Sequence, residues 1–290
     1  MTVSETSVVA DRYADVPHFR VHYLEAGSGH PLVLLHGSGP GATAATNFTP
    51  NIAPLAARFR VIAPDMPGWG ESDTQTDETG RDHAGTLIAL LDKLGIEKAA
   101  LVGNSMGGMT AITAAVRYPD RVSHLVTMGV PSPFPPLFSA AGHSEGLAIL
   151  MRAYREPTAE NMKRLVQVMC FDQARATDEL AQARSAAALA RPEHLDSWNA
   201  QFADEGTLPP YFQLGDAVSR VTAPMLAIHG RDDRVVHYEH SLQLVTRIPD
   251  SRLVLLNRCG HWAQIEHAEE FNSLVTWFVG SEETRARPRA

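Results

Sequence analysis

The residues Leu101-Val-Gly-Asn-Ser-Met-Gly107 carry the strongest structural signal in the sequence. An apolar run leads into them, the pattern G-x-S-x-G spans Gly103 to Gly107, and residues of helical spacing follow. This order predicts a strand, a sharp turn and a helix, with the serine raised above the end of the strand. The glycines leave room where the turn passes close to its neighbours. Ser105 is therefore the candidate nucleophile.

A serine hydroxyl needs a base, and the base needs an acid that orients it. Two later loops supply both, because Gly230-Arg-Asp-Asp233 and Cys259-Gly-His261 each follow an apolar, strand-like run. Loops that follow neighbouring parallel strands lie side by side at one edge of the sheet. We predict His261 as the base and Asp233 as the acid. Asp233 is preferred to Asp232, because the fourth position of G-x-x-D is usually the one aimed at the base.

The glycine-rich loop His36-Gly-Ser-Gly-Pro-Gly41 follows another apolar run. Its small residues leave backbone N–H groups free to meet a negative charge that develops on a substrate carbonyl. We assign this oxyanion hole to the backbone N–H groups of Ser38 and Met106. The loop lacks both the Lys-Ser/Thr ending of a P-loop and the G-x-G-x-x-G spacing of a dinucleotide site, which argues against a phosphate cradle.

Short apolar runs alternate with stretches of helical spacing, which predicts a mostly parallel sheet with helices on both faces. From residue 130 to about residue 216 the alternation stops, and we expect a helical lid there. The predicted division is a core of residues 1–132 and 213–290 and a lid of residues 133–212. The expected strands are Phe19 to Ala26, Pro31 to His36, Arg60 to Pro64, Ala99 to Asn104, His124 to Gly129, Pro224 to His229 and Arg252 to Leu256. The expected helices are Gly80 to Leu94, Met106 to Tyr118, Glu239 to Arg247 and Ala268 to Val279 in the core, and Ser144 to Tyr154, Thr158 to Val168 and Gln182 to Leu189 in the lid.

Composition excludes several classes of protein. Of 290 residues, 44% are hydrophobic and 20% charged, as in a globular chain, and 25 basic against 33 acidic residues give a net charge of −8, which disfavours nucleic-acid binding. Two cysteines are too few for a disulfide framework, so a reducing cytoplasm is expected. The first fifteen residues lack the pattern of a secretory signal, and no apolar run suits a membrane span. The stretch His237-Tyr-Glu-His240 has no third metal ligand, so we expect no metal there and a solvated start of a helix.

The order Ser105, Asp233, His261 with a helical insertion between the first two resembles the α/β-hydrolase fold superfamily from about Phe19 to Val279. Three motifs together are similar to those of the meta-cleavage product hydrolases, which cleave a carbon–carbon bond in ring-fission products of aromatic degradation. These motifs are His36-Gly-Ser-Gly-Pro-Gly-Ala42, Gly103-Asn-Ser-Met-Gly-Gly108 and Cys259-Gly-His-Trp-Ala-Gln-Ile-Glu-His267.

The resemblance implies a 2-hydroxy-6-oxohexa-2,4-dienoate as small-molecule substrate. The products would be a carboxylic acid and a 2-hydroxypenta-2,4-dienoate, and no metal or organic cofactor would be needed. Two routes stay open, one with an acyl group on Ser105 and one in which Ser105 activates water. Relatives often assemble symmetrically, so a homodimer is expected.

The resemblance also implies four substrate contacts. Asn104 and Asn47 would make polar contacts to the dienoate end, and Trp262 would lie against the conjugated chain. On the residues alone, Arg184 is a solvated charge within an Ala-rich helix. The family, however, places there an arginine that binds the substrate carboxylate, a role that suits a bidentate guanidinium.

Two rival functions use the same fold. A carboxylesterase or lactonase would share the triad and the oxyanion hole, but it has no need of a carboxylate-binding arginine in the lid. A ligand receptor would bind without turnover, and its ligand would raise the melting temperature without being consumed.

Overall fold

The structure, a computed structural model of the chain, describes residues 8–139, 144–203 and 209–281. Within these ranges the strands form one eight-stranded sheet in the order β1-β2-β4-β3-β5-β6-β7-β8. The β1–β2 and β2–β4 pairs are antiparallel, and all pairs among β3 to β8 are parallel. The strands are β1 (Ala10–Val16), β2 (Phe19–Ala26), β3 (His30–Leu35), β4 (Phe59–Pro64), β5 (Ala99–Asn104), β6 (Val122–Met128), β7 (Met225–Gly230) and β8 (Ser251–Leu256).

Helices cover both faces of this sheet. One buried cluster joins α2, α3, η3 and α8 to one face, and a second joins α1, α9 and α10 to the other. The core helices are α1 (Ala44–Ala56), α2 (His83–Lys93), α3 (Met106–Arg117), α8 (Glu239–Val245), α9 (Ala263–Glu266) and α10 (Ala268–Gly280), with 3-10 turns at η1 (Pro119–Arg121) and η3 (Pro210–Arg220). None of the helices in the described ranges combines the length and the apolar character needed to cross a membrane.

The predicted α/β architecture is confirmed. All seven expected strands occur within two residues of their predicted bounds. The sequence did not predict β1, because its side chains are mostly exposed and form no apolar run. It did not predict α1 either, because Pro50 and Pro54 lie inside that helix. A capping box at Thr43 begins α1, and buried Phe48 and Leu55 attach it to the sheet.

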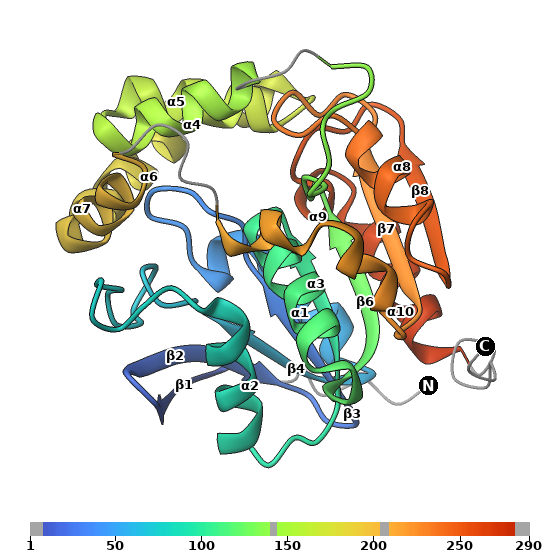
Figure 1. Cartoon of the computed structure of the whole chain (residues 1–290). Helices are drawn as coiled ribbons and strands as arrows, with labels where there is room; N and C mark the ends of the chain where they lie inside the picture. The colour runs from blue at the N-terminus through green and yellow to red at the C-terminus, as the bar shows by residue number, and fades with distance from the viewer. Residues whose placement is uncertain (1–7, 140–143, 204–208, 282–290) are drawn as a thin grey trace, which may run out of the picture.

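Between β6 and β7 the described residues form four α-helices, which we call the helical insertion. They are α4 (Glu145–Arg155), α5 (Ala159–Met169), α6 (Asp178–Leu189) and α7 (Pro192–Gln201), with the short turn η2 (Gln173–Arg175). The described part of residues 130–216 contains no strand. Figure 1 shows these helices together at one end of the molecule. Their buried cluster includes Val235, from the loop after β7, and Trp262 packs against it, so the insertion covers the carboxyl ends of β7 and β8.

The expectation of a solvated helix start at residues 237–240 is wrong for Glu239. Its side chain is fully buried and accepts hydrogen bonds from the backbone N–H groups of Leu137 (2.6 Å), Phe138 (2.5 Å) and Ser139 (2.8 Å). Burial alone would raise the pKa of Glu239, but these hydrogen bonds and one from the Ser139 hydroxyl outweigh it and lower the pKa to about 2. The carboxylate therefore anchors the segment that leads into the helical insertion.

Candidate active site

Ser105 occupies the turn between β5 and α3. Its φ of 50° and ψ of −114° form a conformation that a non-glycine residue seldom adopts, and its N–H donates to the carbonyl of Met128 at 2.8 Å. The flanking glycines make the turn possible, because a Cβ on Gly103 would collide with the backbone of Gly107, and a Cβ on Gly107 with that of Leu35. The side chain of Ser105 is thus presented at the carboxyl end of the sheet.

His261 and Asp233 meet at the ends of β8 and β7. The ring Nδ1 of His261 donates to Asp233 Oδ2 at 2.7 Å, and both side chains are buried. The other carboxylate oxygen accepts the N–H groups of Val235 (2.8 Å) and Val236 (2.9 Å). Since Nδ1 carries the proton, Nε2 of the neutral ring is the nitrogen that can accept one. Asp232 instead lies 3.6 Å from Arg231.

A second histidine supports this carboxylate, and the sequence did not predict it. His229 Nε2 lies 3.3 Å from Asp233 Oδ2 and 2.8 Å from the carbonyl of Val236, and its Nδ1 lies 2.7 Å from the hydroxyl of Ser241. Burial alone would raise the pKa of Asp233, but the charge of His261 and the hydrogen bonds from His229 and His261 hold it well below its usual value. The only feature of the sequence that pointed to His229 was its position as a polar residue within an apolar strand.

Backbone contacts bring Ser105 and His261 to the same place. Gly129 follows directly after Met128, the residue that binds the Ser105 N–H, and a Cβ on Gly129 would lie 2.7 Å from His261 Cε1 and Nδ1. Asn104 makes a second link, because its Nδ2 donates to the carbonyls of Met128 (3.3 Å) and His261 (3.2 Å). The turn that carries Ser105 and the loop that carries His261, which we call the histidine loop, are therefore neighbours across the end of β6.

The loop after β3 lies against Ser105, the candidate nucleophile. A Cβ on Gly37 would lie 3.4 Å from Ser105 Cβ, which puts the next residue, the half-buried Ser38, beside the turn that carries Met106. Asn47 holds this loop, since its Oδ1 accepts the Gly37 N–H (3.3 Å) and its Nδ2 donates to the carbonyl of Thr43 (3.0 Å). Both polar atoms of Asn47 are thus engaged within the protein.

Arg184, on α6, faces the same region. Its guanidinium carbon lies 5.1 Å from the centre of the Trp262 ring, and its Nη2 lies 3.6 Å from the position of a Cβ on Gly39. Burial lowers the pKa of Arg184, yet an arginine stays charged at neutral pH. Among the described residues, none forms an ion pair with Arg184, and its buried Nε has no hydrogen-bond partner. A half-buried guanidinium whose Nε is cut off from water and has no anion beside it is unfavourable, so this arrangement favours an anionic ligand.

Asn104 presents a second unpaired group. Its Oδ1 is buried and has no hydrogen-bond partner within the described part of the chain. A Cβ on Gly37 would lie 2.6 Å from this oxygen, so the oxygen adjoins the glycine-rich loop. An acceptor next to Ser105 and a cation on the helical insertion together suit a ligand that carries both a hydroxyl and a carboxylate.

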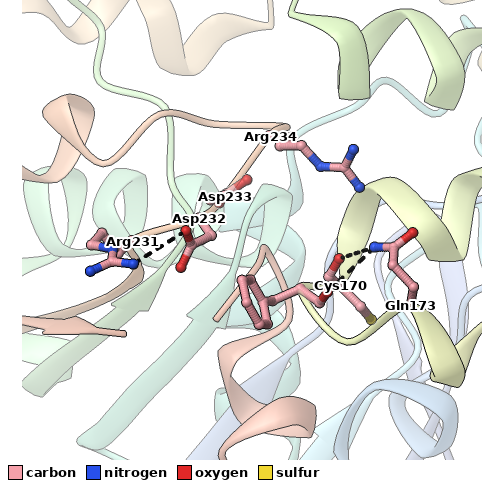
Figure 2. Close-up of a pocket in the computed structure, with 7 residues that line it drawn as sticks. Cys170, Gln173, Arg231, Asp232, Asp233 and Arg234 are labelled. Atoms are coloured by element: carbon pink, nitrogen blue, oxygen red, sulfur yellow. Dashed lines mark hydrogen bonds and ion pairs between the residues drawn. The ribbon is translucent and has the colours of Figure 1, made fainter. Parts of the chain in front are cut away.

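A cleft of about 440 Å³ lies on the outer side of the acid-bearing loop. Figure 2 shows Arg231 and Asp232 on one side of it and Cys170 and Gln173 on the other. Gln173 Nε2 donates to the carbonyl of Cys170 at 3.1 Å, which closes the turn after α5. Since Asp233 also lines the cleft, the acid-bearing loop and the helical insertion meet there. No group of three or more metal-ligating side chains occurs among the described residues.

Comparisons with known proteins agree with this geometry. The family model for the alpha/beta hydrolase fold matches residues 30–268. The chain is 44% identical over 287 residues to the 2-hydroxy-6-oxononadienedioate/2-hydroxy-6-oxononatrienedioate hydrolase of Burkholderia vietnamiensis, across 96% of this chain and 97% of that protein. It is 40% identical over 269 residues to the 2-hydroxy-6-oxo-6-phenylhexa-2,4-dienoate hydrolase of Burkholderia cepacia, across 91% and 92% of the two chains.

The structural comparison extends the likeness to the fold and the helical insertion. A meta-cleavage product hydrolase of Pseudomonas fluorescens IP01 superposes with a TM-score of 0.82 at 34% identity, over 93% of this chain and 97% of that chain. The chain belongs to the α/β-hydrolase fold family and, within it, to the meta-cleavage product hydrolases.

Proposed function

We propose that the protein hydrolyses a carbon–carbon bond in 2-hydroxy-6-oxohexa-2,4-dienoates. The products are a carboxylic acid, formed from the C6 acyl group, and a 2-hydroxypenta-2,4-dienoate. The observation that carries the proposal is Arg184, a half-buried cation with a buried Nε that lies over Trp262 and has no carboxylate partner among the described residues. A neutral ester would leave that cation unpaired, whereas a dienoate pairs with it.

Binding sets the geometry of the reaction. In this proposal Arg184 binds the C1 carboxylate, and Trp262 lies against the conjugated chain. The free Oδ1 of Asn104 accepts a hydrogen bond from the C2 hydroxyl. Asn47 contributes indirectly, because it holds Gly37 and so shapes the loop that carries Ser38. The C6 ketone then lies at Ser105.

The first chemical step moves a proton. The C2 hydroxyl gives up its proton and C5 gains one, with His261 as the carrier, so the dienol becomes a 2-oxo-3-ene. In this tautomer C5 is joined through the C3=C4 double bond to the C2 ketone, which is the electron sink for the bond that breaks. Without it, cleavage would expel an unstabilised carbanion.

Cleavage follows at C6. Ser105 attacks the ketone carbon while His261 takes the serine proton through Nε2, and Asp233 stabilises the imidazolium. The backbone N–H groups of Ser38 and Met106 bind the oxyanion. When the C5–C6 bond breaks, its electron pair delocalises into the C2 ketone, and His261 returns the proton to the leaving dienolate. Water, activated by His261, then releases the acyl group from Ser105 as a carboxylic acid.

The experiment that tests this function is a paired assay of a coloured 2-hydroxy-6-oxo-dienoate and a p-nitrophenyl ester. Fast bleaching of the dienoate with slow ester cleavage is the expected result. Fast ester cleavage with an unchanged dienoate would instead favour a carboxylesterase or lactonase. A dienoate that raises Tm without being consumed would favour a receptor. The assay uses dienoates with a phenyl and with a carboxyalkyl group at C6, because the relatives named above differ there.

Three further assignments belong to the same proposal. Residues 133–212 act as a lid over a core of residues 1–132 and 213–290. The enzyme works in the cytoplasm, in keeping with its two free, buried cysteines. It assembles as a homodimer, which sedimentation of the purified protein would test.

A further inference from the structure

Glu266 joins the histidine loop to the helical insertion. It closes α9, five residues after His261. Its Oε2 accepts the N–H of Gly260 at 2.7 Å, and its Oε1 accepts the N–H groups of Phe171 (2.9 Å) and Asp172 (3.0 Å). One carboxylate therefore binds the residue before His261 and two residues that lie 94 and 95 positions earlier in the chain.

The two backbones also touch directly at this point. His261 N–H donates to the carbonyl of Met169 at 2.7 Å. A Cβ on Gly260 would lie 2.5 Å from that carbonyl oxygen and 2.9 Å from Phe171 N, so only glycine allows this approach. Arg258 adds a contact from the other side, with its guanidinium carbon 5.6 Å from the centre of the Phe171 ring. The histidine loop and residues 169–172 form one packed junction, which we call the 169–172 junction.

This junction sets where Arg184 lies relative to His261. Residues 169–172 lead through η2 into α6, the helix that carries Arg184. Trp262, directly after His261, lies under the Arg184 guanidinium. A shift of the junction would therefore move the cation and the base relative to each other. A substrate whose carboxylate binds Arg184 while its C6 ketone is attacked at Ser105 requires a fixed distance between Arg184 and His261.

We propose that Glu266 is a positioning residue. It keeps His261 and Arg184 at the distance that a substrate bound at both ends requires. The inference rests on the proposed function, because only a carboxylate-bearing substrate reports on the distance between the two side chains. A small neutral ester contacts Ser105 and His261 but makes no use of Arg184. Loss of Glu266 should therefore act selectively on the dienoate.

The test compares Glu266→Ala and Glu266→Gln with Glu269→Ala, an exposed glutamate on the neighbouring helix that serves as a control. We expect Glu266→Ala to lower kcat on the dienoate by about 10- to 100-fold, in keeping with the cost of misplacing reacting groups by about an ångström. Cleavage of p-nitrophenyl acetate should change by less than about threefold, because that ester needs no second anchor. The kcat of Glu266→Gln on the dienoate should lie between those of Glu266→Ala and the wild type, since its amide oxygen can still accept N–H groups on one side of the junction.

Amide hydrogen exchange provides a readout that does not depend on the substrate. Exchange in peptides that cover residues 169–173 and 258–262 should speed up in Glu266→Ala and stay unchanged in Glu269→Ala. Equal losses on dienoate and ester would mean that Glu266 serves only stability, and would overturn the inference, as would unchanged kinetics. If the wild-type protein leaves the dienoate unbleached, the proposed function fails. Unchanged exchange at the junction would then overturn the role of Glu266 on its own.

Discussion

His229 lies 3.3 Å from the same oxygen of Asp233 that binds His261 at 2.7 Å. Two histidine rings thus share one carboxylate oxygen, and His229 is held in turn by Ser241 and Val236. His229→Gln should lower kcat/KM by about tenfold, since a loss of about 1.4 kcal/mol of transition-state stabilisation has that effect. Ser241→Ala keeps the contact to Asp233 and should cost less. Steady-state kinetics on the dienoate measures both effects. Equal losses of kcat/KM in the two variants would show that the contact of His229 with Asp233 does not support catalysis.

Ser105→Ala should leave the fold intact and reduce turnover by about 10⁴- to 10⁶-fold, as loss of a triad nucleophile does. The backbone strain at Ser105 gives a second observable. Alanine still has a Cβ, so the variant keeps the φ of 50° and should melt near the wild-type temperature. Residual dienoate cleavage near the wild-type rate would contradict the assignment of the nucleophile.

Arg184→Gln should raise KM for the dienoate by about 30-fold or more, because truncating one partner of a buried charge pair costs on the order of 2–5 kcal/mol. Ester cleavage should be nearly unchanged. Arg155→Gln, on an exposed part of α4, is the matched control. A parallel rise in KM for ester and dienoate would rule out a carboxylate contact.

Gly129→Ala should slow turnover without weakening dienoate binding. The added Cβ would press on the ring of His261, and Gly129 has a φ of 54°, which strains any other residue. We expect kcat to fall by at least about tenfold while KM stays close to that of the wild type, because a displaced base affects the chemical step. Single-turnover kinetics separates the two quantities, and a change confined to KM would speak against this placement of the base.

Glu239→Gln should destabilise the protein at neutral pH and less so in acid. The pKa of Glu239 is lowered to about 2 in the folded state, from an ordinary value of 4.5. A lowered pKa stabilises the fold above the unfolded value, and that contribution disappears as pH falls from 4.5 through about 2. Urea midpoints of variant and wild type should therefore differ most at pH 7, approach each other below pH 4.5 and converge only as pH falls through about 2. A constant difference would show that the charge of Glu239 contributes nothing.

The sequence predicted those parts of the site that depend on local geometry. Glycines mark the turn at Ser105 because no other residue permits so close a backbone contact, and chain order placed Asp233 and His261 at neighbouring strand ends. The structure bonds Asp233 to His261 at 2.7 Å, and the role of Asp233 as the acid stays a prediction. These inferences needed only the spacing within one turn and the order of strands.

Side chains that bind distant backbone groups could not be predicted. Glu266 accepts N–H groups from residues about a hundred positions away, and backbone amides leave no signature in a sequence. Glu239 was misjudged for the same reason, since its partners Leu137 and Ser139 are ordinary loop residues. Helix α1 was missed because Pro50 and Pro54 conceal its spacing, and β1 because its side chains face solvent.

The contact of Gly260 with the backbone at Met169 has a consequence for engineering. Exchanging the helical insertion between relatives is an obvious way to graft new substrate preferences onto the catalytic core. In this chain the transferred segment would need the same backbone path at residues 169–172. The space between that backbone and Gly260 is too small even for one added methyl group on Gly260. A working chimaera must therefore carry its cut points outside this contact and import the histidine loop together with the insertion.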